Sequence, residues 1–145
     1  MRIIIQRVKN ASVYINKKKH SSINQGLLCF VGFCHLDSEE DFAWSINKLL
    51  KLKLFNNSNS LEELGLQLLI VSQFTLFAST KKGSKPSWSR AANPILAKRL
   101  YNKFVDMSLE KLGIKLATGV FGADMQIESI NDGPVTLILD SKQKE

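Results

Sequence analysis

Histidine and cysteine are scarce in this sequence of 145 residues, and their scarcity argues against several kinds of chemistry. His20 and His35 have no second histidine or carboxylate at metal-ligand spacing, so we do not expect a zinc-dependent hydrolase. Cys29 and Cys34 lie in a run that is typical of a buried strand, and their odd separation would place them on opposite faces. Neither a local disulfide nor a zinc site is therefore expected. The sequence does not exclude a catalytic Ser-His-Asp triad, because the members of a triad need not be neighbours in sequence. It has no Gly-x-Ser-x-Gly motif, however.

Long hydrophobic runs are also missing. Nothing in the sequence approaches the length of a membrane span, and the amino-terminal stretch MRIIIQRVKN has too many charges for a signal peptide. Buried free thiols suit a reducing compartment. We therefore expect a soluble, cytoplasmic protein without membrane association.

Acidic residues are outnumbered, with 13 Asp and Glu against 20 Lys and Arg, which gives a net charge of +7. This surplus favours contact with polyanions such as RNA, but it also improves solubility, so it does not define a site. The hydrophobic content of 44% is enough for one ordinary core, and residues 1–145 are expected to form a single domain.

The apolar pattern predicts an α+β domain with about eight strands and two helices, in which a mainly antiparallel, barrel-like sheet has its helices on one side. The first helix is expected at 38–54, with Ser38 as its N-cap, and the second from Asn93-Pro94 to Gly113. The apolar stripe of the second helix would end in Met107 or Leu112. The segments that are predicted as strands are 2–8, 11–15, 26–34, 66–76, 115–120, 125–130 and 135–140.

Two polar segments are expected to be connections. The first, 16–22, contains Lys17, Lys18, Lys19 and His20, which could contact RNA, although a solvated hairpin is the simpler interpretation. The second, 56–60, has the sequence NNSNS and is predicted to be the least structured part of the chain.

The end of the apolar run 66–76 holds the first candidate site. If this run is a strand, Gln73 and Thr75 face one pocket and the main-chain amide of Phe74 can face a carbonyl oxygen, with Ser72 as a second hydroxyl. Without an evident charged base, hydrolysis here would depend on positioning and backbone polarisation. A threonine in a strand is also common for its β propensity alone, so the short pattern has two interpretations.

The second candidate site is Asn131-Asp132-Gly133-Pro134. This is good turn sequence, and the ordinary interpretation is a trans peptide bond, since only about 5–6% of X-Pro bonds in folded proteins are cis.

Together, Val71–Leu76 and Asn131–Thr136 resemble the paired signatures of the D-aminoacyl-tRNA deacylases, which hydrolyse the ester between a D-amino acid and tRNA. The similarity extends over nearly the whole chain in the order of the family. It departs at residues 55–65, where the family has a longer loop. Further matching segments are Gln6-Arg7-Val8, Lys82-Gly83, Pro86-Ser87, Ala91-Ala92 with Pro94, Leu100-Tyr101 and Gly119-x-Phe121-Gly122-Ala123-x-Met125.

The resemblance implies a β-barrel-like fold, a two-fold homodimer with active sites at its interface, and no metal or other cofactor. Gly133-Pro134 would be a cis peptide that enters the partner subunit's pocket, holds the substrate α-amino group and excludes L side chains. Arg7 would brace this motif and Met125 would belong to the same selectivity site. Glycine has no side chain to exclude, so glycyl-tRNA is expected to be cleaved as well.

Two catalytic mechanisms stay open. In one, Thr75 is a nucleophile or proton carrier. In the other, the ribose 2′-hydroxyl helps to activate water while the Phe74 amide stabilises the oxyanion, and we favour it because the chain offers Thr75 no evident base. Ser72 and Gln73 complete the catalytic candidates.

The basic loop 81–90 is the candidate contact for the tRNA acceptor end, because cations neutralise phosphate and Trp88 can stack on an unpaired base. Its charged residues are Lys81, Lys82, Lys85 and Arg90. A solubilising loop is the alternative. For the whole chain, the rival interpretations are a non-enzymatic RNA-binding module on the same fold and a deacylase with an altered chirality preference and a trans Gly-Pro bond.

Overall fold

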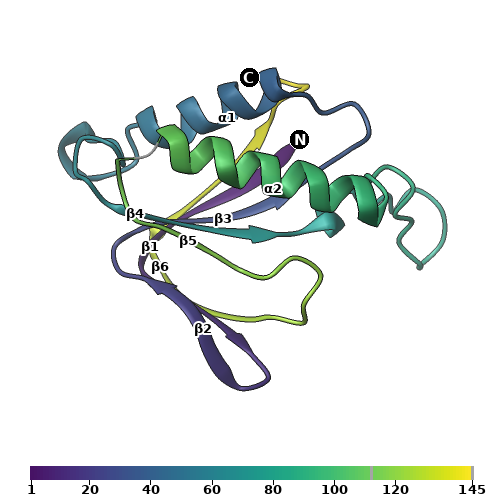
Figure 1. Ribbon diagram of the computed structural model, residues 1–145, viewed down its shortest axis with the longest axis horizontal. Coiled ribbons are helices and arrows are strands. Elements are labelled where there is room, and N and C mark those ends of the chain that lie inside the picture. Colours follow the sequence, from purple (N-terminus) through teal and green to yellow (C-terminus); the bar gives the residue numbers. More distant parts are fainter. Residues whose placement is uncertain (112, 145) are drawn as a thin grey trace.

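The computed structural model describes residues 1–111 and 113–144, and within them a six-stranded sheet packs against two helices (Figure 1). The helices are α1 (Glu39–Lys51) and α2 (Pro94–Lys111), and two short 3₁₀ helices are η1 (Asn56–Ser58) and η2 (Phe74–Phe77). The strands are β1 (Arg2–Ile15), β2 (Lys18–Ile23), β3 (Gly26–Gly32), β4 (Gln67–Ser72), β5 (Leu116–Thr118) and β6 (Gln126–Asp140).

The sheet is mixed, and the prediction of a mainly antiparallel sheet has to be corrected. β1 pairs antiparallel with β2, β3 and β6, whereas β3 with β4 and β4 with β5 are parallel. The reason lies in the helices: α1 connects β3 to β4 and α2 connects β4 to β5, and such crossovers return the chain in the same direction. The Ser21 hydroxyl of β2 donates a hydrogen bond of 2.7 Å to the Thr118 carbonyl of β5, so the sheet curls into a nearly closed, barrel-like shape.

Two pairs of predicted strands are in fact single strands, which lowers the strand count from about eight to six. Segments 2–8 and 11–15 form the continuous β1, and 125–130 and 135–140 form β6. Residues 132–135 bulge out of the ladder between the pairs Val8–Asn131 and Gln6–Thr136. The turn sequence Asn-Asp-Gly-Pro therefore marks a bulge inside a strand and does not end it.

The polar segment 16–22 is mostly strand. Only Asn16 and Lys17 form a turn, with φ of 50° and 63°, and β2 begins at Lys18. A two-residue hairpin turn needs left-handed backbone, which asparagine tolerates well, so a run of lysines is compatible with a tight hairpin. Likewise, segment 56–60 is a closed turn: it contains η1, and Phe55 pairs with Asn59 across it.

Both predicted helices are confirmed, and α1 ends three residues earlier than the predicted range 38–54. Ser38 is the N-cap of α1, and its main-chain amide and hydroxyl both donate to Asp41. α2 begins at Pro94, and the Asn93 side chain accepts a hydrogen bond of 3.0 Å from the Leu96 amide. Leu112, the alternative end of the predicted apolar stripe, lies outside the described residues.

The helices cover one face of the sheet, where the main core is formed. Three fully enclosed rings, Phe33, Phe42 and Phe104, meet edge to face with centroid distances of 5.8–6.2 Å. Such pairs add packing energy beyond the area they bury. A second buried cluster, Val8, Ala11, Val13, Ile23, Leu28, Leu69 and Val71, fills the inside of the curled sheet.

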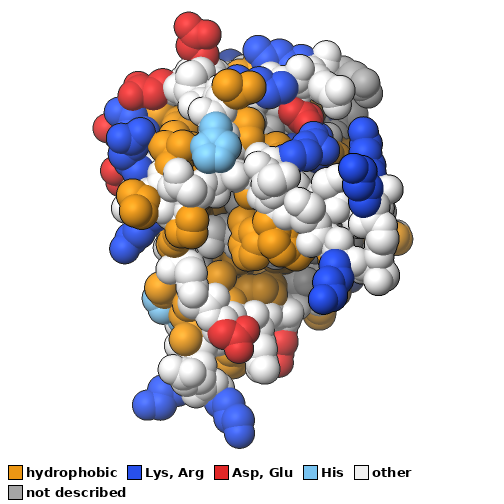
Figure 2. Space-filling model, turned by 90° about the vertical axis from the view of Figure 1, so that its right-hand side faces the viewer, with side chains coloured by type: hydrophobic (Ala, Val, Ile, Leu, Met, Phe, Trp, Pro, Cys, Tyr) orange, Lys and Arg blue, Asp and Glu red, His pale blue; other side chains and the backbone are white. Residues whose placement is uncertain are grey.

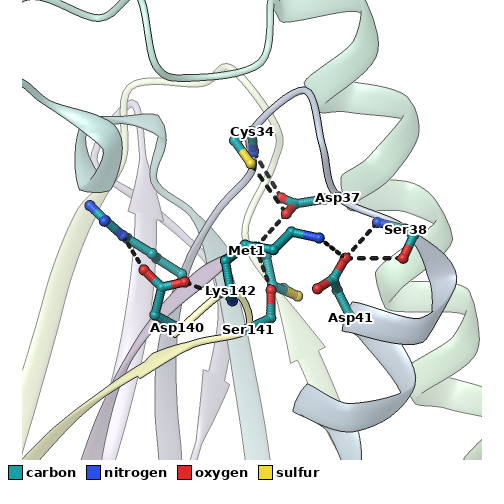
Figure 3. Close-up of polar contacts among 9 residues, drawn as sticks. Met1, Cys34, Asp37, Ser38, Asp41, Asp140, Ser141 and Lys142 are labelled. Carbon is teal, nitrogen blue, oxygen red and sulfur yellow. Dashed lines mark hydrogen bonds and ion pairs between the residues drawn. The ribbon is translucent and has the colours of Figure 1, made fainter. Parts of the chain in front are cut away.

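A polar network joins the first and last strands to the start of α1 (Figure 3). The buried Met1 amino group pairs with Asp37 and donates 2.7 Å to the Ser141 hydroxyl, while Lys142 binds Asp41 at 2.7 Å. Burial alone would raise the pKa of Asp41, but hydrogen bonds from Lys142, Ser141 and Ser38 outweigh it and hold this pKa well below its usual range. Asp41 is therefore ionised at neutral pH and fixes the helix to the sheet.

Cys29 and Cys34 are both free, but only Cys29 lies in β3, so the prediction that one buried strand holds both is wrong. Burial raises the pKa of the Cys29 thiol, which makes it unreactive. Cys34 follows the strand, and its amide donates 2.8 Å to Asp37. Of the helices that the structure describes, none has the length and apolar character needed to cross a membrane.

Candidate active site

A hollow of about 600 Å³ lies at the carboxyl end of β4, on the face shown in Figure 2, where apolar side chains line it. The end of β4, the start of η2, the segment 88–94, the first turn of α2 and the loop 119–125 form its walls. The residues that line it are Phe30, Val71, Ser72, Gln73, Phe74, Trp88, Ala91, Ala92, Asn93, Pro94, Ala97, Phe121, Gly122, Ala123, Asp124, Met125 and Ile127.

The predicted strand 66–76 ends earlier than expected, which changes the geometry of the first candidate site. β4 stops at Ser72, the Gln73 amide makes a last bond of 2.8 Å to the Val31 carbonyl, and the chain then turns into η2. Gln73 and Thr75 therefore do not share a strand face. They are brought together differently, because the Gln73 side-chain amide donates 2.5 Å to the Thr75 hydroxyl.

Phe74 places a free donor at the pocket. It is the first residue of η2, and within the described residues its main-chain amide has no hydrogen-bond acceptor. Phe74 is 54% exposed, and its ring meets that of Trp88 edge to face, with a centroid distance of 5.2 Å. Phe74, which has the unpaired N–H, and Trp88 are thus both among the residues that line the pocket.

Tyr101 of α2 contacts both β4 and the 119–125 loop, which contribute to the pocket wall. The phenol of Tyr101 donates 3.2 Å to the Ile70 carbonyl in β4, and its ring packs on Phe121 at 5.7 Å. Burial raises the pKa of Tyr101 to about 12. The neutral hydroxyl therefore joins α2 to β4, while the ring of Tyr101 supports the 119–125 loop through Phe121.

Met125 lies in the pocket wall, with the catalytic candidates. A Cβ atom at Gly119 would lie 2.6 Å from the Met125 sulfur, so the missing side chain of Gly119 leaves room for this methionine. In this structure Met125 is not grouped with Gly133 and Pro134, which are absent from the pocket wall.

Gly133 and Pro134 form the exposed tip of the β6 bulge, and the peptide bond between them is cis. Arg7 holds the base of this tip: its guanidinium donates 3.0 Å to the Asp132 carbonyl and 2.6 Å to the Leu54 carbonyl. The Asn131 side chain spans the bulge, accepting from the Val135 amide and donating to Thr136. The tip is therefore fixed in position while Gly133 and Pro134 stay exposed.

The basic loop 81–90 is exposed along its whole length. Ser79 and Ser87 exchange two main-chain hydrogen bonds of 2.9 Å, which close the loop at its base. Lys81, Lys82 and Lys85 lie within the closed part, whereas Trp88 and Arg90 follow it and lead to the pocket wall.

Most of the pocket walls have no role that the sequence alone reveals. Several lining residues are small and leave space for the pocket. In the sequence, most of them are noticeable only as parts of the motifs that match the family. They are Ala91, Ala92, Ala97, Gly122 and Ala123. Phe30 and Ile127 give no signal, because an apolar residue in a strand does not reveal which face it lines. In residues 1–111 and 113–144, no three His, Cys, Asp or Glu side chains are grouped to hold a metal ion.

Known proteins resemble this chain in sequence and in fold. The D-aminoacyl-tRNA deacylase of Cytophaga hutchinsonii is 49% identical over 98% of both chains, and that of Dechloromonas aromatica is 48% identical over the full length of both. A solved structure described as c-Myc DNA unwinding element binding protein superposes with a TM-score of 0.91 at 32% identity, covering 97% of this chain and 98% of the other.

A second structure, a probable eukaryotic D-amino acid tRNA deacylase, has a TM-score of 0.83 at 19% identity, with 95% of this chain and 97% of the other covered, and shows the shared fold. A family model described as D-Tyr-tRNA(Tyr) deacylase matches residues 4–140. The chain therefore belongs to the D-Tyr-tRNA(Tyr) deacylase family, a family of ester hydrolases.

Proposed function

We propose that this enzyme hydrolyses the ester bond of D-aminoacyl-tRNA and releases the D-amino acid and tRNA in the cytoplasm. The observation that carries the proposal is the pocket at the end of β4, where the unpaired Phe74 amide and the Gln73–Thr75 pair lie among apolar walls. Family membership and the names of the relatives support the same substrate class.

The proposed reaction needs a donor for the developing oxyanion and a positioned water. The Phe74 N–H would bind the ester carbonyl oxygen as water adds to the carbonyl carbon. The carbon–oxygen bond to the ribose then breaks, and the departing 3′-oxygen takes up a proton. The Thr75 hydroxyl accepts a hydrogen bond from Gln73 and has no base bonded to it in the described chain, which favours activation of water by the ribose 2′-hydroxyl.

Chiral selection is proposed to come from the partner subunit in a two-fold homodimer. The Gly133-Pro134 tip is held rigidly by Arg7 but lies outside its own pocket, as expected for an element that serves another copy. An exposed apolar surface beside β1 and β6 supports dimer formation. It includes Ile138, 71% exposed, and a hollow of about 400 Å³ that is also lined by Ile4 and Leu76.

The acceptor end of tRNA would lie along the basic loop. Lys81, Lys82, Lys85 and Arg90 offer charge to the phosphates, and the Phe74–Trp88 ring pair at the pocket mouth offers a stacking surface. A non-enzymatic nucleic-acid-binding module is the second candidate, since a structural relative is described as a DNA-element binding protein. This candidate predicts binding without release of amino acid.

Matched D-Tyr-tRNA, L-Tyr-tRNA and glycyl-tRNA test the function directly. We expect release of amino acid from the D form and from glycyl-tRNA, with the L form intact and with no loss of rate in EDTA. Cleavage of both tyrosyl forms would contradict the chiral filter, and resistance of glycyl-tRNA would contradict selection by steric rejection. RNA binding without cleavage of any substrate would favour the binding module.

Replacement of Thr75 separates the two mechanisms. In the substrate-assisted mechanism, Thr75→Ala keeps a near-normal single-turnover rate on D-Tyr-tRNA, whereas a tRNA that ends in 2′-deoxyadenosine is cleaved at least about 10²-fold more slowly. Thr80→Ala, at an exposed hydroxyl nearby, is the matched control. A loss of about 10²-fold or more for Thr75→Ala alone would instead identify this hydroxyl as the nucleophile or proton carrier.

A further inference from the structure

The hairpin formed by the end of β1 and by β2 extends away from the helices at one end of the molecule (Figure 1). Residues 16–20, which form its tip, are all exposed. The two-residue turn at Asn16 and Lys17 and the antiparallel pairs on either side of it hold the tip in a defined shape. The hairpin is therefore an ordered extension of the sheet.

The tip carries charge that the described part of the chain does not neutralise. It contains Lys17, Lys18 and Lys19, followed by His20, and none of these lysines forms an ion pair with a described carboxylate, whereas Lys9, Lys53, Lys103 and Lys142 do. The Lys19 ammonium lies 5.8 Å from the centre of the Tyr14 ring, which supports its position without removing its charge. The tip is thus a compact cluster of free cations.

The hairpin and the pocket share one face of the molecule. In Figure 2 the pocket opens near the centre, Lys and Arg side chains flank it, and the hairpin forms the lower end of the same face with positive charge at its tip. The Ser21–Thr118 hydrogen bond fixes β2 to β5, and β5 leads directly into the 119–125 pocket wall. The position of the tip relative to the pocket is therefore fixed by the fold.

We propose that residues 17–19 form a basic arm that binds the phosphate backbone of tRNA beyond the nucleotides held at the pocket. This inference rests on the proposed function and adds a second RNA-binding surface, opposite the 81–90 loop. The six residues of β2 span about 20 Å at ~3.3 Å per residue, enough to reach past the last few unpaired nucleotides. Cations on both sides of the pocket would hold the acceptor stem between them.

The chemistry of the tip favours RNA backbone over other partners. No large apolar side chain is exposed within residues 16–20, so the tip offers no anchor for a protein hot spot or a lipid surface. It has no Phe, Trp or Tyr on which a base could stack. Ammonium groups alone recognise phosphate without reading sequence, which suits an enzyme that accepts many tRNAs.

The test compares a Lys17→Ala/Lys18→Ala/Lys19→Ala triple variant with a control triple variant, Lys51→Ala/Lys111→Ala/Lys115→Ala. The control removes the same charge from the end of the molecule opposite the pocket, where the helices finish (Figure 1). Each protein is assayed on D-Tyr-tRNA and on 3′-O-D-tyrosyl-adenosine, which keeps the reacting ester but has no RNA backbone. The melting temperature verifies that both variants fold.

For the arm variant we expect a KM on D-Tyr-tRNA about tenfold higher, an unchanged kcat and an unchanged rate on the adenosine ester. A plot of log(kcat/KM) against log salt concentration has a negative slope. Its steepness should decrease by about 0.7–0.9 for each phosphate that the arm no longer neutralises. Equal behaviour of the arm and control variants, or an equal decrease in rate on both substrates, would overturn the proposal. If wild-type protein cleaves neither substrate, the proposed function fails, and the arm is then judged by whether its variant binds uncharged tRNA about tenfold more weakly.

Discussion

A Gly133→Ala variant is expected to show a decrease of about 10²-fold or more in kcat/KM on D-Tyr-tRNA while staying folded. Gly133 has a φ of +132°, a conformation that alanine strongly disfavours. A Cβ atom there would lie 3.0 Å from an Arg7 guanidinium nitrogen and 2.9 Å from a Val135 methyl group. Either Arg7 or the tip must then move, so the carbonyl groups of the tip would no longer be placed accurately against the substrate.

The control is Gly65→Ala. Gly65 also has a positive φ, of +59°, but a Cβ atom there would meet nothing within 4 Å. Its replacement therefore adds backbone strain without touching Arg7. We expect near-normal kcat/KM for this control, and an equal loss of activity in both variants would show that strain alone explains the effect of Gly133→Ala.

Mixing two inactive variants tests whether the tip acts across the dimer. Ala123→Trp should fill the pocket, whose wall includes Ala123, while leaving the tip intact. A heterodimer of Ala123→Trp with Gly133→Ala then has one normal pocket facing one normal tip. Recovery of activity after the subunits are exchanged supports action in trans, whereas mixtures that stay inactive show that each tip serves its own pocket.

The second large effect is expected on stability, for the Gly26→Ala variant. This residue pairs with Gln67 where β3 and β4 begin their parallel ladder, and a Cβ atom at Gly26 would lie 1.8 Å from the Gln67 carbonyl oxygen. The obstacle is backbone, so no side-chain rotation relieves it. We expect Gly26→Ala to lower the free energy of unfolding by about 4 kcal/mol or more, and the melting temperature by roughly 10 °C, measured by calorimetry.

Gly113→Ala is the comparison, because a Cβ atom there would meet nothing within 4 Å and its φ lies outside the positive range. Its melting temperature should stay within about 2 °C of wild type. If both glycine variants melt alike, the two strands can separate at Gln67 without cost, and the expected role of Gly26 is wrong.

Sequence patterns are most informative where the chain follows local rules. The start of α1 at Ser38 and of α2 at Asn93-Pro94 follows from capping chemistry, which acts over a few residues. The parallel pairing of β3, β4 and β5 does not follow from the sequence, although the helices between them are predicted correctly. Strand direction depends on how the connections cross the sheet, and no local pattern records it.

The candidate site shows the same limit. Gln73 and Thr75 are predicted to lie together, and they do, but through a side-chain hydrogen bond after the strand has ended. The turn signal at 131–134 is present in the sequence, yet the ladder with β1 resumes beyond it and makes it a bulge. Long-range pairing decides both outcomes. Motif similarity reaches further than periodicity, because it draws attention to Ala91, Ala92 and Phe121, for which the apolar pattern gives no role.

The pairing of β1 with β6 also sets the order of events during folding. Residues 2–14 find their partners in 126–140, so the sheet is joined between its earliest and latest strands. Bringing these distant segments together costs chain entropy before the contacts between them form. Contacts between residues far apart in the sequence therefore slow folding. During synthesis β1 to β5 emerge before β6, so the apolar residues Ile3 and Ile5 of β1 stay incompletely covered until β6 has emerged. The sheet is therefore completed only when β6 docks on β1.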